Sequence, residues 1–114
     1  MSKVTSHILD TTVGRPANGV SVLLENETVP KTWAPVCDAV SDEEGRVANL
    51  VPESLTLRAG MYRLSFDIGP YYAEKGLRAF YPEVCIVFHI HDPEQHYHLP
   101  LLISRFGYTT YRGT

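Results

Sequence analysis

The chain has 114 residues, 44% of them hydrophobic and 20% charged, a composition typical of one globular domain with a single core. Its formal net charge is −3 and no block of like charges occurs, which argues against nucleic acid or an anionic membrane surface as a partner. No apolar run is long enough to span a bilayer, and the first residues lack the pattern of a signal peptide, so we expect a cytoplasmic location and no membrane partner.

Most of the chain has the periodicity and turn chemistry of β-strands. Turn residues gather in "TTVGRPANG" and around Gly45, and Pro35 predicts a bent or edge strand. Only "YYAEKGLRAF" is typical of a helix, which Gly76 keeps short. We expect strands at residues 4–10, 20–26, 32–42, 61–68, 84–90, 97–104 and 108–113, a short strand after Gly45, and one helix near residues 71–79. This pattern predicts an all-β sandwich or barrel forming a single domain over residues 1–114.

The two cysteines, Cys37 and Cys85, lie far apart in the sequence and fit neither a disulfide framework nor a CxxC site. We expect two free, mostly buried thiols in a reducing compartment. The motifs GxSxG and HExxH, the P-loop and the dinucleotide-binding fingerprint do not occur.

Histidines form two HxH pairs, His89 with His91 and His96 with His98. Residues two apart on a strand share a face, so a hairpin at residues 92–95 would bring four imidazoles into one patch suited to zinc. If residues 92–95 instead carry the chain from one sheet to the other, the pairs separate and no such patch forms. His89 and His91 would then be solvent-facing strand residues.

Four segments together resemble the 5-hydroxyisourate hydrolases, the transthyretin-like enzymes of purine breakdown. These segments are "SHILDTTVGRPANGVSV", "GRVANL", "FYPEV" and "HYHLPLLISRFGYTTYRGT". That family ends in Tyr-Arg-Gly-Ser, and this chain ends in Tyr-Arg-Gly-Thr. The hormone-carrying transthyretins lack this ending, which favours the enzyme over the carrier.

The resemblance implies a sandwich of two four-stranded sheets with one short helix. It also implies a homotetramer, a dimer of dimers, with active sites at the dimer–dimer interface, a small-molecule substrate, and neither a metal nor another cofactor. In such a fold His89 and His91 belong to one sheet, and His96 and His98 to the other.

The family's functional residues match positions of this chain. Those implied for catalysis are His7, Arg46, His98 and Thr114, and those implied for substrate binding are His7, Arg46, Tyr111 and Arg112. At position 114, threonine stands where the family has serine. Threonine keeps the hydroxyl, while its methyl restricts rotation about χ1. The period-two pattern agrees with these positions, because His98 falls on the face of its strand opposite to Leu99 and Leu101.

Hydrolysis of 5-hydroxyisourate to 2-oxo-4-hydroxy-4-carboxy-5-ureidoimidazoline must deprotonate water, polarise a carbonyl and protonate a nitrogen leaving group. His7 and His98 suit these proton transfers, in either order, because histidine titrates near neutral pH. Arg46 can hold a planar, oxygen-rich ring or a developing oxyanion. Tyr111 is expected to donate a hydrogen bond to the substrate or to pack on it, and Arg112 to contact it or to form a structural salt bridge.

The sequence leaves two other functions open. A non-enzymatic, transthyretin-like tetramer could carry a small aromatic ligand. A zinc hydrolase could instead use the HxH pairs as metal ligands.

Overall fold

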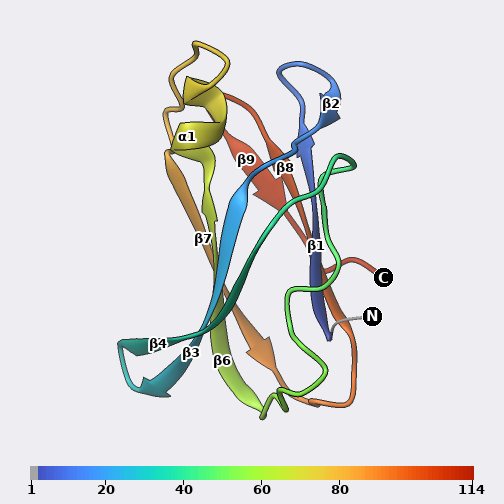
Figure 1. The fold of residues 1–114 in the computed structure, drawn as a ribbon. Coiled ribbons are helices and arrows are strands. Elements are labelled where there is room, and N and C mark those ends of the chain that lie inside the picture. Colours follow the sequence, from blue (N-terminus) through green and yellow to red (C-terminus); the bar gives the residue numbers. More distant parts are fainter. Residues whose placement is uncertain (1–2) are drawn as a thin grey trace.

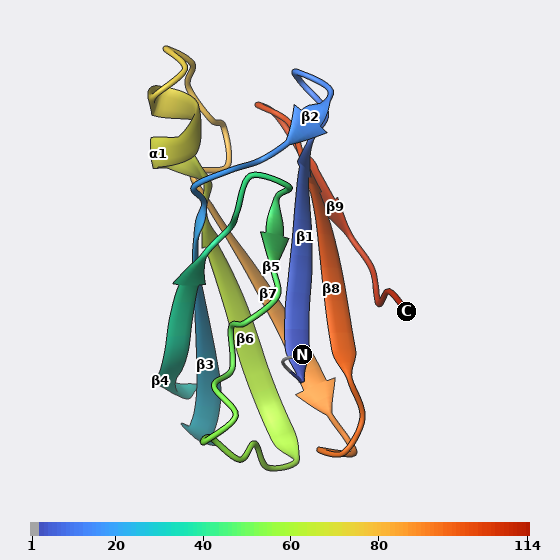
Figure 2. The same cartoon turned by 45° about the vertical axis from the view of Figure 1, so that its right-hand side comes forward.

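Two β-sheets packed face to face make up the protein, and the computed structural model describes residues 3–114 (Figures 1 and 2). The elements in chain order are β1 (Val4–Asp10), β2 (Arg15–Pro16), β3 (Ser21–Val29), β4 (Thr32–Val40), β5 (Arg46–Val47), β6 (Gly60–Asp67), α1 (Ile68–Ala73), β7 (Glu83–Ile90), β8 (Tyr97–Ile103) and β9 (Tyr108–Thr110). The expected all-β sandwich with one short helix is therefore confirmed. No helix within residues 3–114 has the length and hydropathy needed to cross a membrane.

The two sheets differ in size. One has the order β4-β3-β6-β7, and the other has the order β2-β1-β8-β9 with β5 also paired to β1. This second sheet has five strands, where four were expected, because the turn after β1 folds back and pairs Pro16 with Leu9. β4, which contains Pro35, lies at a sheet edge, as Pro35 predicted.

The helix differs from its predicted position near residues 71–79. It begins at Ile68, directly after β6, where the backbone N–H groups of Ile68 and Gly69 both donate to the Pro82 carbonyl. It ends at Ala73, shortly before Gly76, whose φ of 72° lies in the left-handed region. The alternation of apolar residues in β6 continues to Ile68, so the sequence pattern placed the end of the strand one residue too late.

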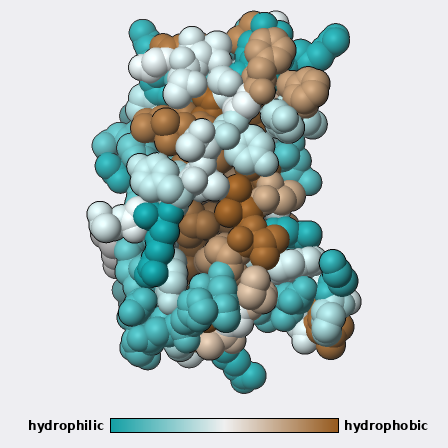
Figure 3. All heavy atoms as spheres, turned by 180° about the vertical axis from the view of Figure 1, so that it is seen from behind, coloured by the Kyte–Doolittle hydropathy of each residue, from teal (hydrophilic) through white to brown (hydrophobic). Residues whose placement is uncertain are grey.

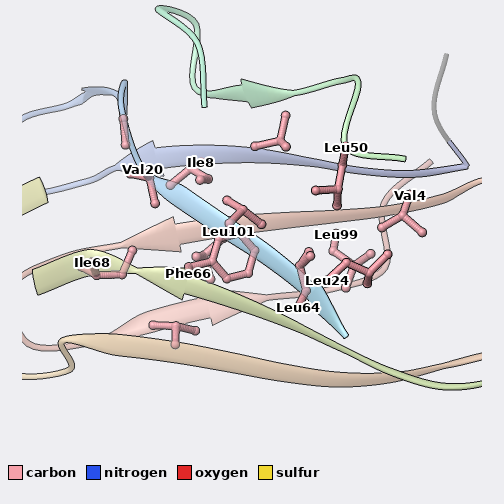
Figure 4. Close-up of a cluster of buried hydrophobic side chains, with 14 of the residues drawn as sticks. Val4, Ile8, Val20, Leu24, Leu50, Leu64, Phe66, Ile68, Leu99 and Leu101 are labelled. Carbon is pink, nitrogen blue, oxygen red and sulfur yellow. The ribbon is translucent and has the colours of Figure 1, made fainter. Parts of the chain in front are cut away.

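Alternate residues of the central strands fill the space between the sheets (Figure 4). Tyr62, Leu64 and Phe66, which alternate along β6, are buried. β8 contributes Tyr97, Leu99, Leu101 and Ile103 to the core. The intervening residues of β8 therefore face outward, away from the other sheet.

Both cysteines are free, as expected. Cys37 is half-buried, but Cys85 is exposed, so the expectation of two mostly buried thiols is wrong for Cys85. Cys85 falls on the outward face of edge strand β7, where nothing packs over it within the sandwich of residues 3–114.

A buried carboxylate connects α1 to β1. Asp10 is 1% exposed and accepts hydrogen bonds from the Tyr71 hydroxyl at 2.8 Å and the Tyr72 hydroxyl at 2.7 Å. The backbone N–H of Thr12 donates to the same carboxylate at 2.9 Å. Because every bond is to a charged acceptor inside the core, this network is a strong anchor for the helix.

The hydrogen bonds from Tyr71 and Tyr72 to Asp10 predict a loss of stability at high pH. Burial raises the pKa of Tyr71 above its ordinary value, and the hydrogen bond to Asp10 raises it further. Burial also raises the pKa of Tyr72, from 10.0 to about 12. Since the unfolded tyrosines ionise first, we expect the free energy of unfolding to fall as pH rises from about 10 toward 12. Urea denaturation across this range measures it, and Tyr72→Phe should show a shallower decline. Equal slopes for the two proteins would contradict the prediction.

Candidate active site

The outer face of the five-stranded sheet carries most of the residues that the sequence singled out. On β1, Val4, Ser6 and Ile8 turn inward, so Thr5 and His7 project from the opposite face. β8 runs parallel to β1, with Thr5 beside His98 and His7 beside Pro100. β5 pairs with the other side of β1 and sets Arg46 beside His7. Three strands thus bring His7, Arg46 and His98 together although they are far apart in sequence.

A pocket of about 240 Å³ opens on this face. Its lining residues are Thr5, Ser6, Arg46, Ala48, His96, His98 and Thr114. Three of the residues expected to be catalytic, Arg46, His98 and Thr114, therefore share one cavity.

Gly45 allows Arg46 to approach β1. Its φ is 75°, and a Cβ atom at this position would collide with the Ile8 carbonyl oxygen. The close approach lets the Ile8 N–H donate to the Gly45 carbonyl at 2.7 Å. Glycine in the Gly-Arg motif is thus required by the backbone, and the arginine is positioned as a consequence.

The His98 ring is held at two of its edges. Its Nδ1 atom lies 2.8 Å from the Thr5 hydroxyl oxygen. At the Cδ2 edge, Gly113 packs so closely that an added Cβ would lie 2.8 Å from Cδ2. The Gly113 N–H also donates to the His98 carbonyl at 2.8 Å, which ties the end of the chain to β8. Nε2 is therefore the ring nitrogen left for a molecule in the pocket.

The surroundings of His98 favour its neutral form. Burial lowers the pKa of His98 below its ordinary value of 6.5, and the nearby His96, His7 and Arg46 lower it further. A neutral imidazole next to a guanidinium can accept a proton from a bound molecule.

His7 is half-buried beside this pocket. Its Nε2 atom lies 2.8 Å from the Glu44 carbonyl oxygen, which can only accept, so Nε2 carries a proton. His7 is also among the groups that lower the pKa of His98, which places the two rings within electrostatic reach of each other.

Tyr111 and Arg112 lie elsewhere in the single chain. Both line a second pocket of about 330 Å³ at the edge of the sandwich, together with His89 of β7 and with His91, which follows that strand. The Arg112 guanidinium stacks 4.6 Å from the centre of the Tyr97 ring and donates to the Gln95 side chain at 3.2 Å. On a regular strand, Tyr111 and Arg112 would point to opposite faces. Because β9 ends at Thr110, this alternation does not apply to them, and both side chains line the same pocket.

The two histidine pairs lie on different sheets, as expected from the resemblance. His89 belongs to β7 in the four-stranded sheet and His98 to β8 in the other, and β7 and β8 do not pair. The hairpin assumed for a four-histidine patch is therefore wrong. Within residues 3–114, no three or more His, Cys, Asp or Glu side chains are arranged to hold a metal ion.

Thr5 of the pocket and Gly113, which packs on His98, were not singled out in the sequence, and His96 was considered only as a metal ligand. The period-two pattern that places His7 on the outer face also places Thr5 there, so this signal was present in the sequence. The contact of Gly113 with His98 depends on how the last residues cross β8, which no local pattern shows.

Gly113 gives a direct test of this packing. In Gly113→Ala the new methyl would also lie 3.0 Å from a Pro100 ring carbon, so His98 or the chain end must move. We expect the rate of the reaction proposed below to fall by about tenfold or more, with a loss of about 1–3 kcal/mol in stability. Gly107→Ala is the matched control, because its new methyl meets only the Ser104 hydroxyl at 3.9 Å. Equal rates for the two variants would show that the close packing does not position His98.

Comparison with known proteins places these features in a family. The family model described as "HIUase/Transthyretin family" matches residues 4–113. A 5-hydroxyisourate hydrolase of Salmonella dublin is 43% identical over 108 residues, which cover 95% of this chain and 78% of the relative. The crystal structure of transthyretin from Sparus aurata matches with a TM-score of 0.90 and 34% identity, covering 99% of this chain and 97% of that one. The structure of Klebsiella pneumoniae 5-hydroxyisourate hydrolase matches with a TM-score of 0.84 and 35% identity, covering 97% and 98%. This chain belongs to the HIUase/Transthyretin family.

Proposed function

We propose that this protein catalyses the hydrolysis of 5-hydroxyisourate to 2-oxo-4-hydroxy-4-carboxy-5-ureidoimidazoline in urate degradation. The observation that carries the proposal is the pocket in which Arg46, His98 and Thr114 meet, with His7 beside it. Relatives named 5-hydroxyisourate hydrolase, such as the Salmonella dublin protein, support the same activity.

The pocket and the adjacent His7 provide a group for each part of this reaction. His98, neutral and with Nε2 free, takes a proton from the attacking water, whose oxygen bonds to the carbonyl carbon of the ring amide. Arg46 stabilises the negative charge that develops on the carbonyl oxygen. The amide carbon–nitrogen bond then breaks, and His7 in its protonated form gives a proton to the leaving nitrogen from Nδ1, since Nε2 is bound to Glu44. The ring opens to a carboxylate and a ureido group.

The test is turnover of freshly generated 5-hydroxyisourate, followed in the ultraviolet. We expect the purified protein to accelerate its disappearance well beyond spontaneous decay, with saturation kinetics and with the ureidoimidazoline as product. A decay rate that does not depend on protein concentration would refute the proposal.

A carrier function is the second candidate, because the scaffold matches a transthyretin structure with a TM-score of 0.90. A carrier would bind a small aromatic molecule without changing it. In that case the ultraviolet assay shows no acceleration, while calorimetry with the same preparation shows ligand binding.

Assembly as a homotetramer, a dimer of dimers, is part of the proposal. Large apolar side chains remain exposed on the chain: Phe80, Tyr81, Val87, Phe106, Tyr108 and Tyr111. The view from behind shows hydrophobic side chains gathered in the middle of one face and framed by hydrophilic ones (Figure 3). Contiguous apolar surface of this kind favours contact with another protein chain. Sedimentation of the active protein tests the proposal, and a fully active monomer would contradict it. The cytoplasmic location stays a prediction, checked by cell fractionation.

Thr114 is proposed to contribute its hydroxyl to the pocket. Serine offers the same donor and the same two acceptor lone pairs, so Thr114→Ser should retain activity within about fivefold of the wild type. Thr114→Val, which keeps the shape and removes the hydroxyl, should lower kcat further than the serine variant does. If Thr114→Val and Thr114→Ser have the same kcat in steady-state kinetics, the Thr114 hydroxyl has no role in the reaction.

A further inference from the structure

Two histidine rings share one hydroxyl group on β1. The Thr5 oxygen lies 2.8 Å from Nδ1 of His98 and 3.0 Å from Nε2 of His96, and both distances fit hydrogen bonds. The rings are nearly parallel, with their planes 18° apart and their centroids 6.3 Å apart. Thr5 is only 5% exposed, whereas His96, directly before β8, is exposed to solvent. Thr5 thus connects the pocket histidine with a solvent-exposed one.

A hydroxyl has one proton and can donate to only one of the two rings. Within residues 3–114 these two nitrogens are the hydrogen-bond partners of the Thr5 side chain. If Thr5 donates to His96, it accepts from His98, whose proton must then be on Nδ1. If Thr5 donates to His98, the His98 proton must be on Nε2. The tautomer of one ring is therefore coupled to the tautomer of the other.

The charge in the pocket favours the first arrangement. Arg46 lines the same cavity and lies close enough to lower the pKa of His98. A positive charge attracts a lone pair and repels an N–H dipole, so Nε2 of His98 is better placed with its lone pair toward the pocket. The proton then belongs on Nδ1, where Thr5 accepts it, and Thr5 donates to His96.

We propose that Thr5 and His96 are positioning residues that hold His98 in the Nδ1–H tautomer, so that Nε2 can accept a proton from water. This inference rests on the proposed hydrolysis. His98 becomes an imidazolium when Nε2 takes that proton, its Nδ1–H remains bonded to Thr5, and the extra proton leaves to solvent after ring opening. Thr5 thus orients the base, and His96 orients Thr5.

Protonation of His96 has a consequence for the tautomer of His98. A protonated His96 carries N–H at Nε2 and can only donate to Thr5, which turns the Thr5 hydroxyl toward Nδ1 of His98. His98 then presents Nε2–H to the pocket and is no longer a base. The base function of His98 therefore requires a neutral His96, whose Nε2 lone pair accepts the proton of the Thr5 hydroxyl.

Three variants test the proposal in the full-length protein. Thr5→Val keeps the shape and removes the hydroxyl, and should lower kcat by about 10- to 100-fold while KM changes by less than about threefold. Thr5→Ser restores the hydroxyl and should return kcat to within about threefold of the wild type. His96→Gln retains an acceptor near the Nε2 position, so kcat should stay within about threefold of the wild type. Thr11→Val is the matched control, because the Thr11 hydroxyl donates to the Ile103 carbonyl and contacts neither ring.

Nitrogen-15 NMR of the histidine rings, in protein without substrate near pH 8, gives a readout independent of activity. We expect His98 to carry its proton on Nδ1 in the wild type, Thr5→Ser and His96→Gln, and to populate the Nε2–H tautomer in Thr5→Val. The same tautomer in wild type and Thr5→Val, or an Nε2–H tautomer of His98 in His96→Gln, would overturn the proposal. If the wild type does not accelerate 5-hydroxyisourate decay, the proposed function fails, and the NMR comparison still decides the role of Thr5.

Discussion

His98→Asn should lower kcat/KM for 5-hydroxyisourate by about 100- to 10,000-fold, the range expected when a general base is lost. The asparagine amide reaches about as far as Nδ1, so it can still meet the Thr5 hydroxyl that lies 2.8 Å from that atom. What it lacks is the second ring nitrogen, Nε2, which faces the pocket. The substitution therefore removes the proton acceptor and preserves the contact that holds the side chain. Steady-state ultraviolet kinetics measure the effect.

His89→Asn is the matched control for this experiment. His89 is exposed on β7, in the other sheet, and does not line the pocket that contains His98, so the same substitution is made outside that pocket. Its kcat/KM should stay within about twofold of the wild type. If His98→Asn keeps more than about a tenth of the wild-type value while its stability is unchanged, His98 is not the base.

Asp10→Ala should destabilise the fold by about 3 kcal/mol or more, because it removes the acceptor for two buried tyrosine hydroxyls. Tyr72 is fully buried and Tyr71 is 7% exposed, so water cannot replace the lost carboxylate without opening the core. The contact between α1 and β1 should loosen first. Urea denaturation at a fixed protein concentration measures the loss, since assembly would otherwise change the apparent stability.

Two further variants show whether burial is the cause. Asp10→Asn keeps the shape and one acceptor oxygen, so its loss should be smaller, about 1 kcal/mol. Asp38→Ala removes an exposed carboxylate on edge strand β4 and should change stability by no more than about 0.5 kcal/mol. A loss in Asp10→Ala no larger than that in Asp38→Ala would mean that the buried network contributes nothing.

The alternation along β8 was sufficient to predict which of its residues fill the core and that His98 faces outward. The strand period is two, and one side of the sheet must be buried, so the pattern of Leu99 and Leu101 determines the face of every neighbour. The same local physics predicted β1, β6 and β7 to within one residue at each end, whereas β3 continues three residues beyond its predicted end, to Val29. The motifs around His7, Arg46 and the final tetrapeptide carried the resemblance, and through it the family.

Which side chains meet on the faces of the sheets depends on the tertiary structure. Thr5 meets His98 because β1 and β8, more than 90 residues apart, pair in parallel in one register. The two HxH pairs separate because residues between them cross from one sheet to the other, an outcome that a four-residue gap leaves open. Asp10, charged and near a turn, is buried only because Tyr71 and Tyr72 from α1 cover it. Each of these depends on long-range pairing, whose free energy is shared over whole strands and is not encoded in any short segment.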